Sequence, residues 1–223
     1  MFADREEAGR KLGAKLMRFK GQDACVFALP RGGVPVGFEI ARMLGAPLDL
    51  IIVRKLGAPH QPELAIGALA DGEHPQIVLN DDIVTMLRVS GEYIAEEKER
   101  QLLEIERRRQ SYLAGRPRAS ASRRIAIIVD DGIATGATIR AAIRSIRAAK
   151  PARLVLAVPV APTETIAALR READEIVCLE AHEDFMAISI YYRNFRQLDD
   201  EEVRDLLARI PSPPPAATPE QRA

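Results

Sequence analysis

Short apolar runs alternate with amphipathic stretches along most of the chain. The apolar runs are rich in β-branched residues, as in strands buried on both faces, and we expect such strands at 24–29, 48–53, 125–129, 154–160 and 175–179. Helical periodicity lies between and around them, at 3–19, through 40–44, through 139–146, at 164–171 and at 198–210. The alternating order predicts an α/β fold with a mainly parallel central sheet and crossover helices.

The segment between the second and third of these strands has a different pattern. Runs at 64–69 and 76–79 flank Asp71-Gly72, which predicts a β-hairpin. Asn80 or Asp81 can cap a short helix that runs through Leu87.

A long polar helix is expected next, over residues 91–113. Glu96 with Arg100, and Glu104 with Arg108, have the favourable four-residue spacing, worth about 0.3 kcal/mol a pair. We interpret this charged run as a solvated helix face. A narrow apolar stripe leaves a homodimer contact open, and its members are Tyr93, Ile94, Leu102, Ile105 and Tyr112.

Composition narrows the function classes. The chain has 32 Lys plus Arg and 32 Asp plus Glu, so its zero net charge gives no support for a nucleic-acid or membrane-surface binder. Cys25 and Cys178 lie in apolar runs and are expected as free thiols. The charged N-terminus lacks a signal-peptide pattern, and the apolar run 154–162 is too short for a bilayer. We expect a cytoplasmic protein with a disordered, proline-rich tail at 211–223.

The candidate chemistry is concentrated where the strand 125–129 meets the helix that follows it. Asp130 and Asp131 end the strand, and the small-residue loop 132–138 leads into the helix. Backbone N–H groups at a helix start favour a phosphate, whereas paired carboxylates suit the hydroxyls of a sugar diol or a hydrated Mg²⁺. The alternative is an ordinary turn with Thr138 as the helix N-cap. The loop matches neither the Walker A pattern nor the Gly-x-Gly-x-x-Gly pattern.

Two further loops carry cations at predicted strand ends. Arg31-Gly32-Gly33 follows the strand 24–29, and Arg54-Lys55 follows the strand 48–53. Since the carboxyl ends of parallel strands share one edge, we expect both groups to face the ligand that binds at 130–138.

The stretch from Val129 to Thr138 resembles the signature of the type I phosphoribosyltransferases. The resemblance implies that Asp130 and Asp131 hold the ribose hydroxyls of phosphoribosyl pyrophosphate, and hold Mg²⁺ through water. It implies catalytic roles for Asp130, Asp131, Arg54 and Lys55. The residues that it implies for substrate binding are Arg31, Gly32, Gly33, Gly132, Ile133, Ala134, Thr135, Gly136, Ala137 and Thr138. Members of the family often have a non-proline cis peptide in the loop that corresponds to 30–33.

The resemblance also predicts the architecture. We expect one domain over residues 1–210, with a hairpin and helix insertion at about 56–124 and a small C-terminal hood at about 180–197. The hood contains Phe185, Tyr191 and Tyr192. These rings could stack on an acceptor base or pack the hood itself.

The implied activity is transfer of 5-phosphoribosyl from phosphoribosyl pyrophosphate to a nitrogenous small molecule, with release of pyrophosphate. Ala134 stands where enzymes of 6-oxopurines have an aspartate, and Ala65 where adenine enzymes have a glutamate, so the acceptor stays open. Relatives often have lysines where this chain has residues 58–61, which lowers the expected charge at the pyrophosphate. The alternative is a non-catalytic regulatory protein that binds phosphoribosyl pyrophosphate or a nucleotide.

Overall fold

A five-stranded parallel sheet forms the centre of the protein in a computed structural model that describes residues 1–72, 75–113 and 115–212. Its strand order is β2-β1-β6-β7-β8, and every neighbouring pair is parallel. The bounds are β1 Ala24–Ala28, β2 Leu48–Leu50, β6 Ile125–Val129, β7 Arg153–Pro162 and β8 Glu175–His182. The predicted mainly parallel α/β sheet is therefore confirmed.

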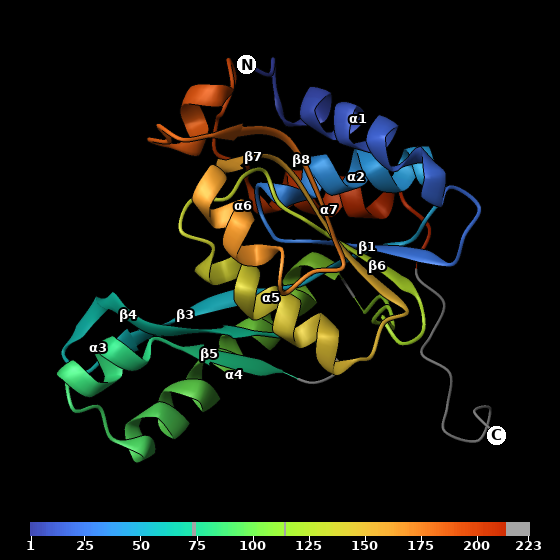
Figure 1. Cartoon of the computed structure of the whole chain (residues 1–223). Coiled ribbons are helices and arrows are strands. Elements are labelled where there is room, and N and C mark those ends of the chain that lie inside the picture. The colour runs from blue at the N-terminus through green and yellow to red at the C-terminus, as the bar shows by residue number, and fades with distance from the viewer. Residues whose placement is uncertain (73–74, 114, 213–223) are drawn as a thin grey trace.

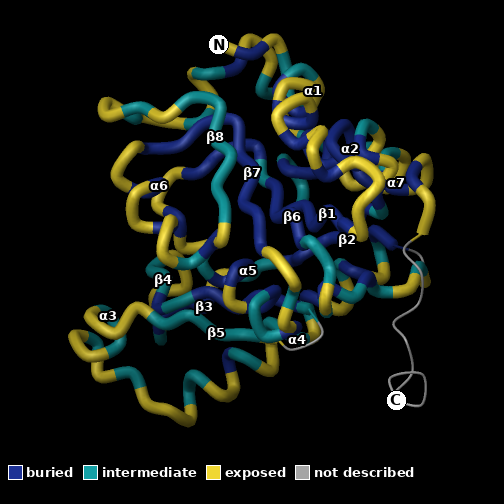
Figure 2. Tube along the Cα trace, turned by 45° about the vertical axis from the view of Figure 1, so that its right-hand side comes forward, coloured by how far each residue is buried: buried dark blue, intermediate teal, exposed yellow. Residues whose placement is uncertain are grey.

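Helices cover both faces of this sheet (Figure 1). One face is covered by α1 Arg5–Leu16, α2 Gly33–Leu44 and α7 Asp200–Ala208, and the other by α5 Ala137–Ala148 and α6 Thr163–Leu169. Strand alternation divides the core: Val26 and Ile127 pack toward α2, whereas Phe27 and Ile128 pack toward α5. β1, β2, β6 and β7 are accordingly almost wholly buried, whereas the edge strand β8 is of intermediate exposure (Figure 2).

A second, antiparallel sheet lies beside the first and is built from the insertion. It contains β3 Val53–Ala58, β4 Gln61–Ala70 and β5 Gln76–Leu79. The helices α3 Asp81–Met86 and α4 Gly91–Leu113 follow it. The sheet packs between α5 and α4, so the expected hairpin and long helix are confirmed (Figure 1).

The prediction of one strand over 48–53 is wrong. β2 ends at Leu50, and the Asp71 carboxylate accepts a hydrogen bond from the Ile52 N–H at 2.7 Å. The Asp71 N–H in turn donates to the Ile52 carbonyl at 3.0 Å, so the chain leaves the main sheet at this point. Arg54 and Lys55 consequently lie inside β3, rather than at the carboxyl end of a main-sheet strand.

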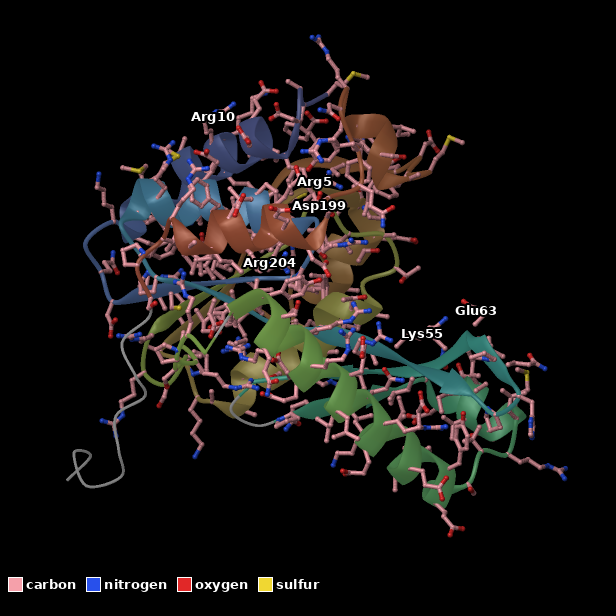
Figure 3. All side chains as sticks on the ribbon, turned by 180° about the vertical axis from the view of Figure 1, so that it is seen from behind. Arg5, Arg10, Lys55, Glu63, Asp199 and Arg204 are labelled. Atoms are coloured by element: carbon pink, nitrogen blue, oxygen red, sulfur yellow. The ribbon has the colours of Figure 1, made fainter. Side chains whose placement is uncertain are left out.

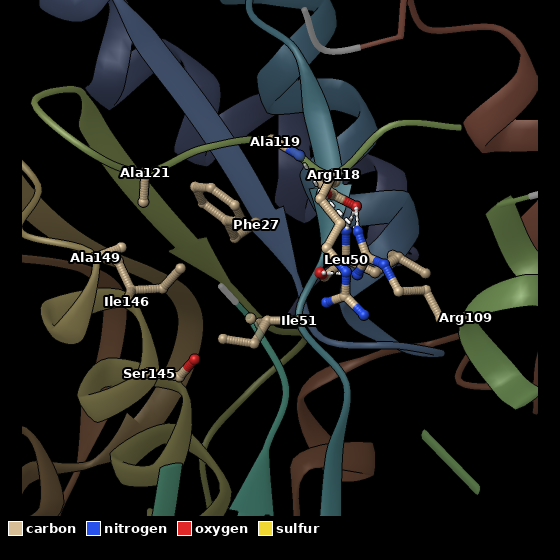
Figure 4. Close-up of a pocket in the computed structure, with 12 residues that line it drawn as sticks. Phe27, Leu50, Ile51, Arg109, Arg118, Ala119, Ala121, Ser145, Ile146 and Ala149 are labelled. Carbon is tan, nitrogen blue, oxygen red and sulfur yellow. Dashed lines mark hydrogen bonds and ion pairs between the residues drawn. The ribbon is translucent and has the colours of Figure 1, made fainter. Parts of the chain in front are cut away.

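The interpretation of α4 as a solvated charged helix is also wrong in part. Arg109 is only 5% exposed, and its guanidinium binds the Asp49 carboxylate at 2.7 and 2.8 Å (Figure 4). It also binds Asp71 Oδ2 at 3.1 Å. This buried cluster fastens the insertion to the main sheet. The expected Glu104–Arg108 pair is present, but Arg100 pairs with Glu97 instead of Glu96.

The apolar stripe of α4 packs within its own chain. Ile105 and Tyr112 belong to the main core, and Tyr93, Ile94 and Leu102 pack against that core. The stripe is therefore used largely within the chain, and a homodimer stays a prediction.

The N-terminal end of the chain lies against the hood. Phe2 forms a bridge with Tyr192, next to the short 3₁₀ helix η2 Ile188–Tyr191, while η1 Met17–Phe19 extends α1.

Both cysteines are free thiols, as expected. In residues 1–72, 75–113 and 115–212, no helix is both long and apolar enough to cross a bilayer. Disorder was predicted for the tail at 211–223. From residue 213 onward, this tail lies outside the described residues.

Candidate functional site

The candidate site lies where the connections of the main sheet diverge. β1 and β6 are neighbours, with Ala28 opposite Val129, but the chain runs from β1 to β2 on one side and from β6 to β7 on the other. Open α/β sheets bind ligands outside the carboxyl ends of the strands at such a switch point. The loop after β1 and the paired aspartates after β6 therefore meet.

Two glycines allow this meeting. A Cβ at Gly32 would lie 2.5 Å from Asp131 Cγ, and one at Gly33 would lie 2.8 Å from the Val129 carbonyl oxygen. Neither contact is possible for a side chain. The loop backbone thus packs directly on the aspartate pair, which joins two of the groups that the sequence singled out.

The loop before Gly33 has the backbone expected from the resemblance. The peptide bond between Pro30 and Arg31 is cis. Gly32 is the N-cap of α2, so the loop leads straight into a helix. The first N–H groups of α2 are already used, because Gly33 donates to the Leu29 carbonyl at 2.9 Å and Val34 donates to the Arg31 carbonyl at 3.1 Å.

Asp131 is held by a residue that the sequence reading missed. Arg5 Nε donates to Asp131 Oδ2 at 2.7 Å, and both side chains are about one-tenth exposed. The same guanidinium lies 3.9 Å from the centre of the Phe195 ring and donates to the Arg196 carbonyl at 2.9 Å. Arg5 therefore connects α1, the aspartate pair and the hood. Its position in a surface-type helix gave no signal of this contact.

Burial governs the electrostatics of the pair. It raises the pKa of Asp130 well above its usual value, and the neighbouring Asp131 raises it further. Burial also raises the pKa of Asp131, against the opposing effect of Arg5. A buried and a half-buried carboxylate side by side favour a ligand that brings hydroxyl donors or a cation.

The loop after the aspartates combines buried and exposed positions. Gly136 has a φ of +80° and is the N-cap of α5, so the alternative in which Thr138 caps the helix is wrong. Ile133 is anchored by its N–H, which donates to the Val160 carbonyl at 2.9 Å. The side chains that point outward from the loop are those of Ala134, Thr135, Ala137 and Thr138.

The hood closes over this loop. A Cβ at Gly132 would lie 2.7 Å from Ile188 Cγ2, and the Tyr192 hydroxyl donates to the Asp131 carbonyl at 2.6 Å. Tyr192 is 5% exposed, so it packs the hood and is not available to stack on a base. Phe185 and Tyr191 stack on each other with ring centres 5.2 Å apart.

The side chains of the expected cationic pair, Arg54 and Lys55, point in opposite directions. Successive strand residues point to opposite faces. Arg54 points toward α4, where its Nε donates to Gln101 Oε1 at 3.0 Å, and burial and then Arg108 lower its pKa. Lys55 points to the other face and pairs with Glu63 at 3.0 Å (Figure 3). The expectation that both cations face the same ligand edge is therefore wrong.

Two cavities flank these loops. One, of about 460 Å³, lies between the second sheet and the loop after β6, and Thr135, Ala137 and Ala68 contribute to its lining. The other, of about 150 Å³, is polar and has Arg31 in its wall.

The aspartate pair could hold a metal only together with other ligands. Among the described residues, no group of three or more His, Cys, Asp or Glu side chains could hold a metal ion. One or two carboxylates, completed by substrate oxygens and water, is nevertheless the usual arrangement around Mg²⁺. The donor chemistry of Asp130 and Asp131 therefore fits this ion.

Comparison with known proteins identifies phosphoribosyl transferases as relatives of this chain. A family model described as the phosphoribosyl transferase domain matches residues 4–193. A curated Mycobacterium tuberculosis protein, provisionally named a phosphoribosyl transferase, is 47% identical over 209 residues. The alignment covers 94% of this chain but 47% of the relative, so the chain spans about half the length of the curated relatives it matches. The crystal structure of TT1426 from Thermus thermophilus is 39% identical, with a TM-score of 0.79, over 94% of this chain and 99% of that chain.

Proposed function

Because the chain belongs to the phosphoribosyl transferase domain family, we propose that it transfers 5-phosphoribosyl from phosphoribosyl pyrophosphate to a nitrogenous small molecule in the cytoplasm. In this reaction the bond from C1 of the ribose to the pyrophosphate oxygen breaks, and a bond from C1 to the acceptor nitrogen forms. Pyrophosphate leaves with the bonding electron pair. An acceptor N–H loses its proton.

The observation that carries this proposal is the packing of Gly32 on Asp131 at the switch point. It brings the loop after β1 onto the diol acceptors, which directly precede the loop that leads into the N-terminus of α5. The ribose 2′ and 3′ hydroxyls would donate to Asp130 and Asp131. The 5′-phosphate would accept from the loop of residues 132–138, with the Thr135 and Thr138 hydroxyls as further donors.

The remaining site residues have supporting roles. Arg31, Gly32 and Gly33 would receive the pyrophosphate, and Arg54 would approach it from the α4 side. Lys55 would have to leave Glu63 to take part in the reaction. Since the developing charge lies on the leaving group, these groups act mostly by positioning and charge stabilisation.

Asp130 and Asp131 would hold Mg²⁺ through water, as expected from their donor chemistry. When bound with the donor substrate, the ion would neutralise part of the negative charge on pyrophosphate. A third carboxylate is not required for this, because substrate oxygens complete the coordination.

One observation favours the non-catalytic alternative. Arg54 and Lys55, the cations expected at the pyrophosphate, are instead paired with Gln101 and Glu63 on opposite faces of β3. A protein that binds phosphoribosyl pyrophosphate without turning it over needs no more than a stable diol and phosphate site.

Pyrophosphate release from phosphoribosyl pyrophosphate with Mg²⁺, measured across a panel of bases and amines, separates the two functions. Release with at least one acceptor supports the transferase. Tight binding without release across the panel supports the regulatory protein. Asp130→Asn combined with Asp131→Asn should abolish binding and release, with Asp205→Asn, at an exposed position of α7, as a control that keeps both. Unchanged release in the double variant would refute the site.

A further inference from the structure

Three arginines from distant parts of the chain line the polar cavity beside the loop after β1. Arg31 belongs to that loop, and Arg107 and Arg108 belong to the last turns of α4. The cavity has a volume of about 150 Å³. A single water needs roughly 10–15 Å³ on this measure, so the cavity has room for an anion of several atoms.

The two α4 arginines keep most of their hydrogen-bond donors free. Arg107 donates twice to Glu104, at 2.8 and 3.0 Å, and Arg108 donates once to Glu104, at 2.7 Å. A guanidinium has about five N–H groups, so each arginine retains at least three donors. The shared carboxylate fixes both side chains, because it lies three and four residues before them on the same helix.

Arg31 is similarly available. Its Nη1 lies 3.7 Å from Asp200 Oδ1, which is an ion pair but is too long for a hydrogen bond. Asp200 instead accepts from the Tyr112 hydroxyl at 2.9 Å. The Arg31 guanidinium can therefore turn toward an incoming anion without breaking a hydrogen bond to Asp200.

The charge of the cavity wall also favours an anion. Arg31, Arg107 and Arg108 are opposed by Glu104 and Asp200, and the Ser111 hydroxyl adds a neutral donor. Planar guanidinium groups are well suited to phosphate oxygens, since they present paired donors.

Arg31 connects the cavity to the loop that packs on the paired aspartates. Arg31 immediately precedes Gly32, whose backbone packs on the Asp131 carboxylate. A ligand whose ribose lies on Asp130 and Asp131 would thus have its leaving group within reach of this wall.

Resting on the proposed transfer reaction, we propose that Arg107 and Arg108 are further binding residues for the pyrophosphate group. The insertion then has a direct part in the site: its helix α4 completes, from the far side, the cationic wall that Arg31 begins. Glu104 is a positioning residue that orients the two guanidinium groups.

The test is calorimetric titration of the full chain with two probes, inorganic pyrophosphate and ribose 5-phosphate. Arg107→Ala with Arg108→Ala should weaken pyrophosphate binding at least about tenfold, because hydrogen bonds to charged groups are lost. Ribose 5-phosphate binding should not change. Arg107→Lys with Arg108→Lys, which keeps the charge but not the planar fork, should give an intermediate loss.

Two further variants sharpen the result. Asp200→Asn removes the acid opposite Arg31 and should strengthen pyrophosphate binding. Arg10→Ala is the matched control, since Arg10 is an exposed α1 arginine in a surface pair with Glu6 (Figure 3). It should leave the affinities for both probes unchanged.

The outcomes are distinguishable from failure of the proposed function. Unchanged pyrophosphate affinity in the double alanine variant overturns the assignment of Arg107 and Arg108 and leaves the proposed function intact. Equal loss for both probes also overturns that assignment, because it indicates general damage to the site. Failure of the wild-type chain to bind ribose 5-phosphate overturns the proposed function itself.

Discussion

Gly32 is the residue at which the two halves of the site touch. A methyl group there would lie 2.5 Å from Asp131 Cγ, so Gly32→Ala must displace either the carboxylate or the loop. We expect ribose 5-phosphate to bind about tenfold more weakly or worse, equivalent to one lost charge-assisted hydrogen bond. Calorimetric titration measures this change.

Gly91 provides the matched control for this prediction. It lies at the start of α4, and a Cβ there would meet nothing within 4 Å. Gly91→Ala should therefore bind ribose 5-phosphate like the wild type. Equal affinities in Gly32→Ala and the wild type would show that Asp131 does not contribute to the binding of the ribose.

Arg5 is a second single residue on which the site depends, because it forms a buried ion pair with Asp131. Removing one partner of such a pair leaves a buried charge unpaired and typically costs about 3–5 kcal/mol. We expect Arg5→Ala to lower the free energy of unfolding by about 3 kcal/mol, since the Asp131 carboxylate is only about one-tenth exposed. Urea unfolding followed by circular dichroism measures this loss.

An exposed arginine of the same helix separates this effect from a general one. Arg10→Ala breaks only a surface pair with Glu6 and should change the free energy of unfolding by less than about 0.5 kcal/mol. If Arg5→Ala were as stable as Arg10→Ala, the ion pair with Asp131 would not be a stabilising contact.

At the scale of elements, the short hood helix η2 is fitted to the loop after β6. A Cβ at Gly132 would lie 2.7 Å from Ile188 Cγ2, which is a side-chain atom that can be removed. We expect Gly132→Ala to lower the free energy of unfolding by about 1–3 kcal/mol through overpacking. Urea unfolding of the variant checks the value.

Removing the opposing side chain tests whether this contact is the cause. Ile188→Ala in the Gly132→Ala background should restore part of the lost stability, with a coupling energy of about 0.5–3 kcal/mol in a double-mutant cycle. Strict additivity of the two substitutions would mean that the hood does not rest on the loop.

The directions of the Arg54 and Lys55 side chains depend on the strand to which these residues belong. As a strand end they would face one ligand, but inside β3 they point to opposite faces. The signal that could have separated them is Leu56, which is buried on the same face as Arg54. The apolar run 48–53 predicts a single strand that ends just before Arg54. The alternation of buried and exposed residues in β3 is therefore not visible in the sequence pattern.

At the scale of the whole molecule, sequence periodicity predicted the individual helices and strands, because their patterns are local. The strands of the main sheet, the hairpin and α4 all follow from patterns within a few residues. The division into two sheets does not, because it depends on Asp71 binding the Ile52 N–H across 19 residues. The site divides in the same way. Paired acids and loop glycines are visible in sequence, whereas Arg5 reaches Asp131 only through the packing of α1 on the sheet.

The buried Arg109 cluster decides whether the two sheets unfold together. Arg109 binds Asp49, which belongs to β2 of the main sheet, and Asp71, which directly follows β4. Arg109→Ala leaves two buried carboxylates without this partner, so we expect a loss of about 3–5 kcal/mol. We further expect the single unfolding transition of the wild type to separate into two, with the insertion unfolding first. Urea unfolding with far-ultraviolet circular dichroism measures both effects.

Arg100→Ala is the control from the same helix. Arg100 forms a three-residue-spaced pair with Glu97 and its side chain is 61% exposed, so its loss should leave one transition with nearly the wild-type midpoint. A single transition at the wild-type midpoint in Arg109→Ala would contradict the coupling role of the cluster. Two transitions in the wild type would show that the insertion is already an independent unit, because the cluster could then not be what joins the sheets.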